Sequence, residues 1–112
     1  MNSCRSISFE ELSRNPDKLK GTALTFTGEV IQVTEPVIGD TVTLRIDVTK
    51  TEYGFYTDTI LATVEVPEGE DRILEDDIIT FYGDCEGLYT YTSVLGSKIS
   101  LPKISIRYYE IQ

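Results

Sequence analysis

Alternation of apolar and polar residues in steps of two is the feature that most limits what this chain can fold into. The clearest case covers residues 41–49, where the apolar positions are Val42, Leu44, Ile46 and Val48. A period of two is that of a β-strand with one buried face. The same period returns over residues 23–34, 60–66, 77–83 and 104–108, and no strand–helix–strand order is visible, which argues against a parallel sheet. We therefore predict an all-β fold of five strands preceded by one short helix.

The length of the chain sets the number of domains. With 112 residues there is room for one core, so residues 1–112 are predicted to form a single domain. A helical lead-in over residues 8–20 precedes a barrel over residues 22–110. Ser8 and Glu11 have the spacing of a helix N-cap with its capping box. The inward strand positions give the expected core: Leu24, Phe26, Val30, Val42, Leu44, Ile46, Ile60, Val64, Ile79, Phe81, Ile104 and Ile106.

Glycines and phase changes add detail to the strand pattern. The apolar phase shifts by one after Gly28, which predicts a β-bulge and a kink near that glycine. The fourth strand is expected to end at Gly83, and residues 72–74 are expected to form one helical turn before it. A hairpin with its tip at residues 96–97 follows. Tyr108 is expected on the inward side of the last strand.

Composition excludes several kinds of chemistry. The chain has no His, so it cannot form a Ser-His-Asp or Cys-His catalytic site or a metal site with imidazole ligands. It has no phosphate-binding loop and no dinucleotide fingerprint, and no pair of carboxylates is marked out for acid–base work. We therefore expect no enzyme activity, no catalytic residue and no cofactor. The acids at residues 75–77 lack the spaced ligands of a calcium loop, so no metal site is expected either.

The two cysteines, Cys4 and Cys85, have neither the spacing of a metal motif nor the number of a disulfide framework. A disulfide between them is an alternative that geometry decides. No apolar run is long enough to span a membrane and no signal peptide is visible, so we expect no membrane insertion by this chain. In a further alternative, Cys4 is the lipid-bearing residue of a trimmed lipoprotein, which places the domain in the bacterial envelope; otherwise we expect a cytoplasmic protein.

Three segments carry a resemblance to a known family. Residues 73–83, Ile-Leu-Glu-Asp-Asp-Ile-Ile-Thr-Phe-Tyr-Gly, resemble the fourth strand of OB-fold proteins, and residues 21–30 resemble their first strand. The lead-in over residues 9–21 is similar to that of small bacterial OB domains of the tRNA-anticodon-binding-like type, found in Gram-positive membrane-anchored proteins and lipoproteins and in phages. The resemblance implies a five-stranded, partly open antiparallel Greek-key barrel, and it specifies no activity. Because the usual helix between strands three and four is very short here, the N-terminal helix is expected to plug the barrel.

The resemblance also indicates where a ligand would bind. OB-fold proteins bind through the outer face of their second and third strands and through the adjoining loops. The outward residues of those strands include no aromatic side chain, and Arg45 is the cation among them. Aromatic residues lie instead in two loops, so the candidate binding residues are Tyr53, Phe55, Tyr56, Tyr89, Tyr91 and Arg45. The alternative is that these rings pack over the barrel ends.

Charge is distributed unevenly along the chain. Lys and Arg number 10 against 19 Asp and Glu, a net charge of −9, and residues 68–88 hold eight of the acids. This segment is either a solvated rim or an acidic face for a basic partner. The candidate residues of that face are Glu68, Glu70, Asp71, Glu75, Asp76 and Asp77. Since phosphate-tracking surfaces need clustered Lys and Arg, the net charge argues against nucleic acid and for a protein partner.

Three functions are compatible with these features. The first is a non-catalytic interaction module of unidentified ligand, such as the soluble domain of a bacterial envelope protein. The second is an acidic inhibitor or nucleic-acid mimic, of phage or mobile-element type, that docks on a basic protein. The third is a nucleic-acid-binding OB domain that uses the tyrosine-bearing loops.

Overall fold

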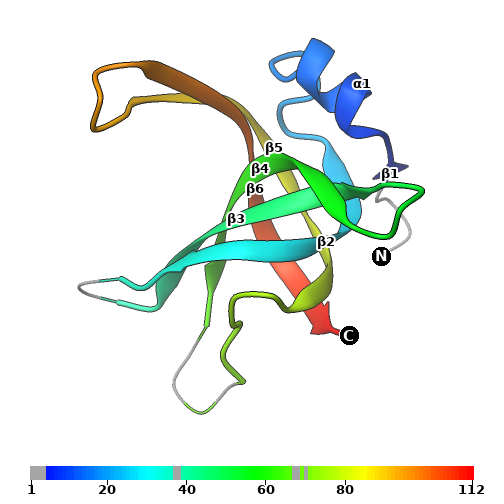
Figure 1. Ribbon diagram of the computed structural model, residues 1–112, viewed down its shortest axis with the longest axis vertical. Helices are drawn as coiled ribbons and strands as arrows, with labels where there is room; N and C mark the ends of the chain where they lie inside the picture. The colour runs from blue at the N-terminus through cyan, green and yellow to red at the C-terminus, as the bar shows by residue number, and fades with distance from the viewer. Residues whose placement is uncertain (1–4, 37–38, 67–68, 70) are drawn as a thin grey trace.

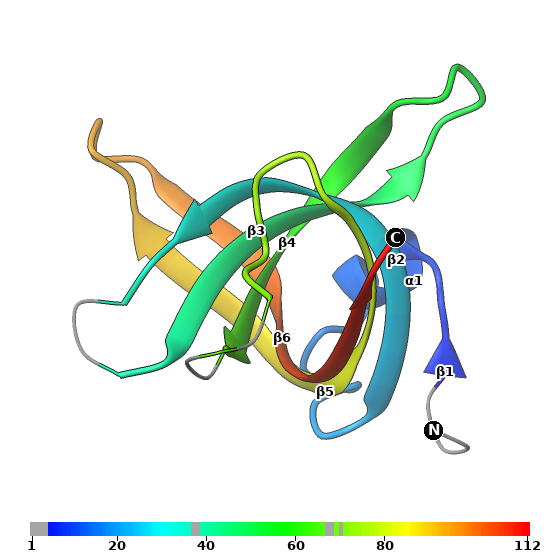
Figure 2. The same ribbon diagram turned by 90° about the horizontal axis from the view of Figure 1, so that it is seen from below.

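Five strands pair in a ring to form the body of the molecule. The structure, a computed structural model, describes residues 5–36, 39–66, 69 and 71–112. The elements in chain order are β1 (Arg5–Ser6), α1 (Phe9–Arg14), β2 (Ala23–Thr34), β3 (Thr41–Lys50), β4 (Tyr56–Glu65), β5 (Ile78–Thr92) and β6 (Lys98–Ile111). The strand order β2–β3–β4–β6–β5 closes through a second pairing of β2 with β5 (Figures 1 and 2). This arrangement is a five-stranded OB-fold barrel, so the predicted fold is confirmed.

The shortest strand pairing of the ring is the one between β4 and β6. These strands are parallel, and their pairing extends from Leu61 with Lys103 to Thr63 with Ser105. The other strand pairs of the ring are antiparallel and longer. Where the β4–β6 pairing ends, an open groove of about 1140 Å³ lies along the two strands. The ring of strand pairings is closed, so the barrel is less open than predicted, and its shortest pairing lies beside this groove.

The core fills the barrel and extends past both of its ends. All twelve predicted core residues are buried. Five further buried residues join the same cluster: Leu12, Leu19, Ala62, Ile73 and Cys85. Leu12 and Leu19 come from the N-terminal lead-in, and Ile73 comes from the connection between β4 and β5. These two segments therefore close the core beyond what the strands themselves cover.

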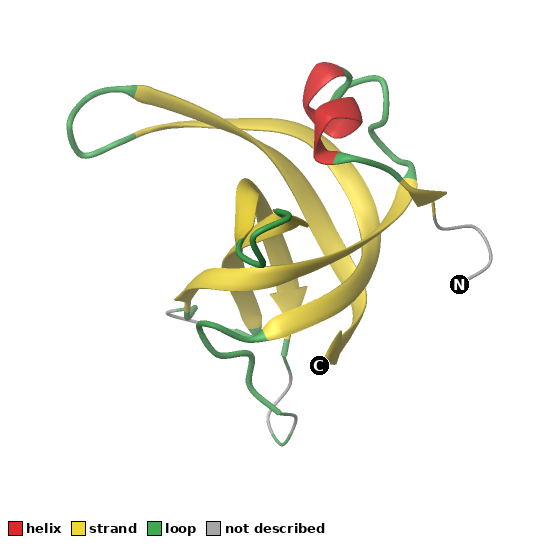
Figure 3. Cartoon of the chain, turned by 45° about the vertical axis from the view of Figure 1, so that its right-hand side comes forward, coloured by secondary structure: helices red, strands yellow, loops and turns green. Residues whose placement is uncertain are grey.

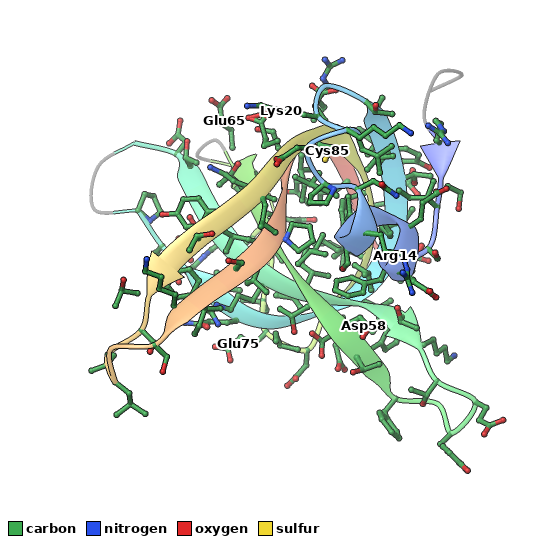
Figure 4. The ribbon with its side chains drawn as sticks, turned by 90° about the horizontal axis from the view of Figure 1, so that it is seen from above. Arg14, Lys20, Asp58, Glu65, Glu75 and Cys85 are labelled. Atoms are coloured by element: carbon green, nitrogen blue, oxygen red, sulfur yellow. The ribbon has the colours of Figure 1, made fainter. Side chains whose placement is uncertain are left out.

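The N-terminal lead-in forms a short capped helix followed by turns. The Ser8 side chain accepts a hydrogen bond from the Glu11 amide at 3.1 Å, as the capping-box spacing predicts. The lead-in is tied to β5, because the Gly21 amide donates to the Cys85 carbonyl at 2.7 Å. Figure 4 labels Cys85 where it lies against this segment, and its thiol is free, buried and 3.5 Å from the Pro16 carbonyl oxygen. A disulfide to Cys4 concerns a residue outside the described part of the chain.

The connection between β4 and β5 contains no helix at residues 71–74, so the helical turn predicted there is wrong. Instead the Asp77 carboxylate accepts a hydrogen bond from the Leu74 amide at 2.8 Å, and this turn places Ile73, which is 3% exposed, under the barrel. Figures 1 and 3 show α1 at the opposite end of the barrel from this connection. The N-terminal helix therefore covers the other end and does not occupy the place of the missing helix.

The bulge in β2 lies three residues after the glycine that was expected to cause it. The register against β3 shifts between Val30 and Gln32, so Ile31 is the extra residue and is exposed. Gly28 has a different role, because a Cβ there would lie 2.4 Å from the Asp47 carbonyl oxygen. The absence of a side chain at Gly28 lets β2 and β3 approach closely where β2 passes from one neighbour to the other.

The fourth barrel strand does not end at Gly83, contrary to prediction. It continues to Thr92, with a register shift between Cys85 and Gly87, and it forms with β6 a long hairpin that projects from the barrel (Figure 1). Gly83 is needed inside the strand, because a Cβ at this position would lie 2.3 Å from the Ser105 carbonyl oxygen. A glycine between alternating apolar residues here indicates close strand packing and not a strand end.

Tyr108 faces outward, contrary to prediction. Tyr82 pairs with Tyr108 while Gly83 pairs with Ile106, so Arg107 is an extra residue in β6. This bulge reverses the phase of the strand beyond Ile106. Tyr108 is therefore half exposed, its ring 5.8 Å from that of Tyr82, while Tyr109 packs against the core.

Candidate functional site

Arg45 meets the projecting hairpin on the outer face of the barrel. It lies in β3 between the buried residues Leu44 and Ile46, so the strand pleat directs its side chain outward. Its guanidinium carbon lies 5.1 Å from the centroid of the Tyr91 ring, and an Arg45 N–H donates to the Tyr91 hydroxyl. The guanidinium therefore binds the ring through a cation–π contact and a hydrogen bond.

A second cation and a second tyrosine continue the same arrangement. The Lys103 ammonium, from β6, lies 5.3 Å from the centroid of the Tyr89 ring. The Tyr89 and Tyr91 rings are themselves 6.2 Å apart and inclined by 34°. Three strands thus bring together Arg45, Tyr89, Tyr91 and Lys103, which we call the cation–tyrosine cluster.

An apolar side chain lies between the two cations. In the register of the sheet Arg45 pairs with Leu61, and Leu61 pairs with Lys103, so the three form one row across β3, β4 and β6. Leu61 is 8% exposed, although it is not a member of the core cluster. The sequence places Leu61 on the outer face, and the structure shows that this outer position is covered.

The part of the β5–β6 hairpin formed by residues 87–109, which we call the acid-free hairpin, has no acid although the protein is acidic. None of the 23 residues from 87 to 109 is Asp or Glu, and Lys98, Lys103 and Arg107 lie among them. Arg107 is ion-paired with Asp84 at 2.7 Å, so the free positive charge of this segment comes from the lysines. The acid-rich connection over residues 71–77 lies at the bottom of Figure 1, away from the hairpin at its top. Arg45 and Lys103 thus place two positive charges at the cluster, with the exposed Glu86 just before the acid-free run.

Lys103 was not identified as a site residue from the sequence. The signal that points to it is the acid-free run itself, combined with the alternation that places Tyr89, Tyr91 and Lys103 on one face of a hairpin. In the structure Gly87 pairs with Lys103, Tyr89 with Leu101 and Tyr91 with Ile99. Recognising this requires knowing that β5 continues past Gly83.

The second group of predicted aromatic residues lies elsewhere. Tyr53 and Phe55 stack on each other at 6.5 Å near the tip of the β3–β4 hairpin, and they are 81% and 59% exposed. Tyr56 is partly buried and pairs with Lys50 at the base of that turn. Figure 2 shows the β3–β4 and β5–β6 hairpins projecting on different sides of the barrel. The predicted aromatic residues therefore form two separate groups and not one rim.

The residues of the predicted acidic face differ in their structural surroundings. Glu68 and Glu70 lie outside the described residues. Asp77 holds the turn before β5 through its bond to the Leu74 amide. Asp71, Glu75 and Asp76 are exposed, and the neighbouring Arg72 is ion-paired with Glu35 at 2.5 Å. Within the described part of the chain, no group of three or more His, Cys, Asp or Glu residues is placed to hold a metal ion.

The groove between β4 and β6 has a different character from the cluster. Its lining includes three acids, Glu65, Asp71 and Glu110, while Arg107 is the one base among the described residues that line it. Tyr108 also lines the groove, and its hydroxyl donates to the Glu110 carboxylate at 2.9 Å. This hydrogen bond and the negative charge of Glu110 raise the pKa of Tyr108 above its ordinary value of 10.0. The groove is thus an acidic surface next to a protonated phenol.

Comparison with known proteins supports the fold assignment. The chain is an OB-fold barrel by its strand order, and two of the solved structures that resemble it are crystal structures of the mitochondrial single-stranded DNA binding protein Rim1 from S. cerevisiae. For the first the TM-score is 0.55 and the sequence identity 14%, and the match covers 82% of this chain and 95% of the other. For the second, a selenomethionine-labelled crystal, the values are 0.52 and 13% with the same coverage. No family model matches the chain, and no curated protein sequence matches it.

Two further findings bear on this chain as a whole. Among the described residues, no helix is long and apolar enough to cross a membrane. The similar structures are named as binding proteins, and at this level of identity the likeness establishes a shared fold. Function must therefore be argued from the residues of this chain.

Proposed function

We propose that this protein is a single-stranded nucleic-acid-binding OB domain that uses the cation–tyrosine cluster. The observation that carries the proposal is the convergence of Arg45 from β3, Tyr89 and Tyr91 from β5, and Lys103 from β6. Binding of single strands combines aromatic platforms for bases with cations for phosphates, and both are present at this place. The proposal concerns the third of the functions that the sequence left open.

Each member of the cluster has a chemically defined task. The Tyr89 ring is 44% exposed, so a base can stack on the side that Lys103 does not cover. Arg45 and Lys103 lie in one row on either side of Leu61, and both present donors to phosphate oxygens. Tyr91 holds the Arg45 guanidinium in place, so less side-chain freedom is lost when a phosphate binds.

The net charge of −9 opposes this function less than the total suggests. Salt screens charges that are farther apart than about 10 Å at ordinary ionic strength, so the local cations dominate at the cluster. With two or three phosphates contacted, the logarithm of the association constant should fall with the logarithm of salt concentration with a slope of about −1.4 to −2.1. This slope is shallow, and we expect binding in the micromolar range at low salt.

The names of the similar structures agree with the proposal. Rim1 is named as a single-stranded DNA binding protein, and its fold matches 82% of this chain. The identity of 14% transfers no residue role, so the argument for this chain rests on its own cluster.

The experiment is a fluorescence anisotropy titration of labelled single-stranded DNA and RNA at low and moderate salt. Arg45→Met should weaken binding at least tenfold, because the charge-assisted contact of the guanidinium with a phosphate is lost. Arg14→Met is the matched control, since Arg14 is an exposed arginine of α1 that is ion-paired with Glu10 at 3.0 Å. Equal losses in the two variants, or no binding by the wild-type protein at low salt, would contradict the proposal.

A second candidate function is supported by the acidic groove between β4 and β6. Glu65, Asp71 and Glu110 line an opening of about 1140 Å³, which suits a basic segment of a protein partner. The test is the binding of a lysine-rich peptide to the wild-type protein and to Glu65→Gln. A loss of binding in Glu65→Gln supports this candidate, and equal binding of the two proteins contradicts it.

A further inference from the structure

The tip of the β5–β6 hairpin presents two adjacent aliphatic side chains to solvent. Val94 is 104% exposed and Leu95 is 94% exposed, so neither contributes to the core. A single exposed apolar residue needs no explanation, whereas this pair lies at the end of the hairpin that carries the cation–tyrosine cluster. A ligand that lies on the cluster can therefore reach the tip as well.

Hydrogen bonds hold the tip in one conformation. The Ser93 amide donates to the Ser97 carbonyl at 2.7 Å, and the Gly96 amide donates to the Ser93 carbonyl at 2.9 Å. The Ser97 amide donates in turn to the Ser93 hydroxyl at 3.2 Å. Gly96 has a φ of +86°, which a glycine adopts without strain. Val94 and Leu95 thus form a preorganised apolar edge.

The surroundings of this edge suit a nucleic acid. The part of the hairpin formed by residues 87–109 contains no acid, and Lys98 pairs with Thr92 immediately below the tip. Nucleic acids expose apolar surface mainly on the faces of their bases, and aliphatic side chains of DNA-binding proteins insert between base steps or stack on them. In a duplex the one base-pair face that is free without distortion is the terminal one, at the junction with a single strand.

We propose that Val94 and Leu95 form a wedge that stacks on the terminal base pair of a single-strand/duplex junction, while the single strand lies on the cation–tyrosine cluster. This inference rests on the proposed function and deepens it, because it names the preferred ligand as a duplex with a single-stranded extension. The acid-free hairpin then contacts both parts of the junction: its arms contact the strand, and its tip contacts the end of the duplex.

The test compares three labelled ligands at low salt: a single strand, a blunt duplex, and the duplex carrying that strand as an overhang, with each polarity of overhang in turn. The wild-type protein should bind one overhang duplex about fivefold or more tighter than the single strand, which is the size of a partial base contact. Val94→Ser combined with Leu95→Ser should abolish this preference and leave the single-strand affinity unchanged. A fluorescent base analogue at the terminal pair should report the contact in the wild-type protein and not in the double variant.

A matched control separates this effect from a general loss of apolar surface. Leu74 is 57% exposed on the acid-rich connection at the other end of the barrel, so Leu74→Ser should keep the junction preference. Circular dichroism checks that all variants are folded.

Each other outcome identifies what fails. Single-strand binding without a junction preference, or a preference that persists in the double variant, overturns the wedge and leaves the proposed function standing. An equal loss of single-strand and junction binding in the double variant also overturns it, because the tip then contacts the strand itself. Self-association of the wild-type protein that the double variant lacks would make the tip a protein interface and overturn the wedge. The absence of binding to every ligand overturns the proposed function and this inference together.

Discussion

Leu44 and Arg45 are neighbours in β3, and the strand pleat sends their side chains to opposite faces. Leu44 is fully buried in the core, whereas Arg45 lies on the outer face against Tyr91. The strand therefore supplies a core residue and a candidate binding residue at adjacent positions. Substitutions at these two positions should separate stability from binding.

Leu44→Ala should destabilise the protein by about 2–5 kcal/mol, because it removes buried methyl groups and leaves a cavity in the barrel. Thr41→Ala is a control in the same strand at an exposed position, where a change within about 0.5 kcal/mol is expected. Chemical denaturation of both variants measures the free energy of unfolding. A Leu44→Ala variant as stable as the wild-type protein would contradict the assignment of this strand face.

Glu110→Gln should lower the pKa of Tyr108 toward its ordinary value of 10.0, because the amide carries no negative charge to oppose the phenolate. Because the pKa of Tyr108 is raised in the folded protein, the Tyr108–Glu110 hydrogen bond adds to the free energy of unfolding at pH values below the pKa of Tyr108 in the unfolded chain. This contribution is lost as the pH rises through the pKa of Tyr108 in the folded protein. Since Tyr108 is solvent-exposed, we expect the global stability to change little. An NMR titration of the tyrosine ring carbons measures the pKa; an unchanged value in Glu110→Gln would remove the assigned cause.

For single residues, the sequence predicts which side chains point into the core and which point outward wherever the period of two in a strand is unbroken. Arg45 is recognisable as an outward cation because it lies between buried Leu44 and Ile46. Lys103 is not recognisable in the same way, because its place in the cluster depends on the continuation of β5 past Gly83 and on the parallel pairing of Lys103 with Leu61. Leu61 lies on the outer face according to the period of its strand, yet it is buried, and the local sequence does not show this either because the pairing of Leu61 with Lys103 joins distant parts of the chain.

The strands depart from their sequence patterns at the glycines and bulges. A period of two predicts the two faces of a strand until an extra residue reverses it, as Arg107 does in β6 and Ile31 does in β2. Gly28 and Gly83 were both interpreted as points of interruption, but in the structure both permit close packing of adjoining strands. Sequence alone does not separate a glycine that ends a strand from one that a neighbouring strand approaches.

Gly83→Ala tests this interpretation of the β5–β6 contact. The added Cβ would lie 2.3 Å from the Ser105 carbonyl oxygen, so the strands must separate, at a cost of about 1–3 kcal/mol. Thermal unfolding of the variant measures the effect. A variant with wild-type stability would show that β5 and β6 are not in close contact at this position.

In the whole molecule, the acid-rich segment and the segment without acids lie apart from each other. The acid-rich connection over residues 71–77 and the acid-free hairpin lie at different ends of the structure, as Figures 1 and 3 show. The net charge argues for a protein partner, but neither this sum nor the position of the acids along the chain records where the charges lie in the folded molecule. The barrel topology supplies that information, since it brings a hairpin that is distant in sequence to the outer face of β3.

This separation of charge has a measurable consequence for binding. Charge reversal far from the cluster, as in Glu75→Lys, should strengthen single-strand binding about twofold or less at moderate salt, because screening weakens the distant charge. Lys103→Glu should weaken binding by far more, since it places an acid in the cluster itself. Anisotropy titrations measure the affinity of both variants for the single strand. Changes in affinity of equal size and opposite direction would show that the net charge, and not the cluster, controls binding.

The most direct measurement of the central claim is an NMR titration of the labelled protein with a short single-stranded oligonucleotide. The account predicts that amide signals shift around Arg45, Leu61, Tyr89, Tyr91 and Lys103, while those of Tyr53, Phe55 and the acid-rich connection stay in place. Shifts confined to the β3–β4 hairpin tip or to the groove between β4 and β6, or no shifts at low salt, would contradict the assignment of the cation–tyrosine cluster as the binding site.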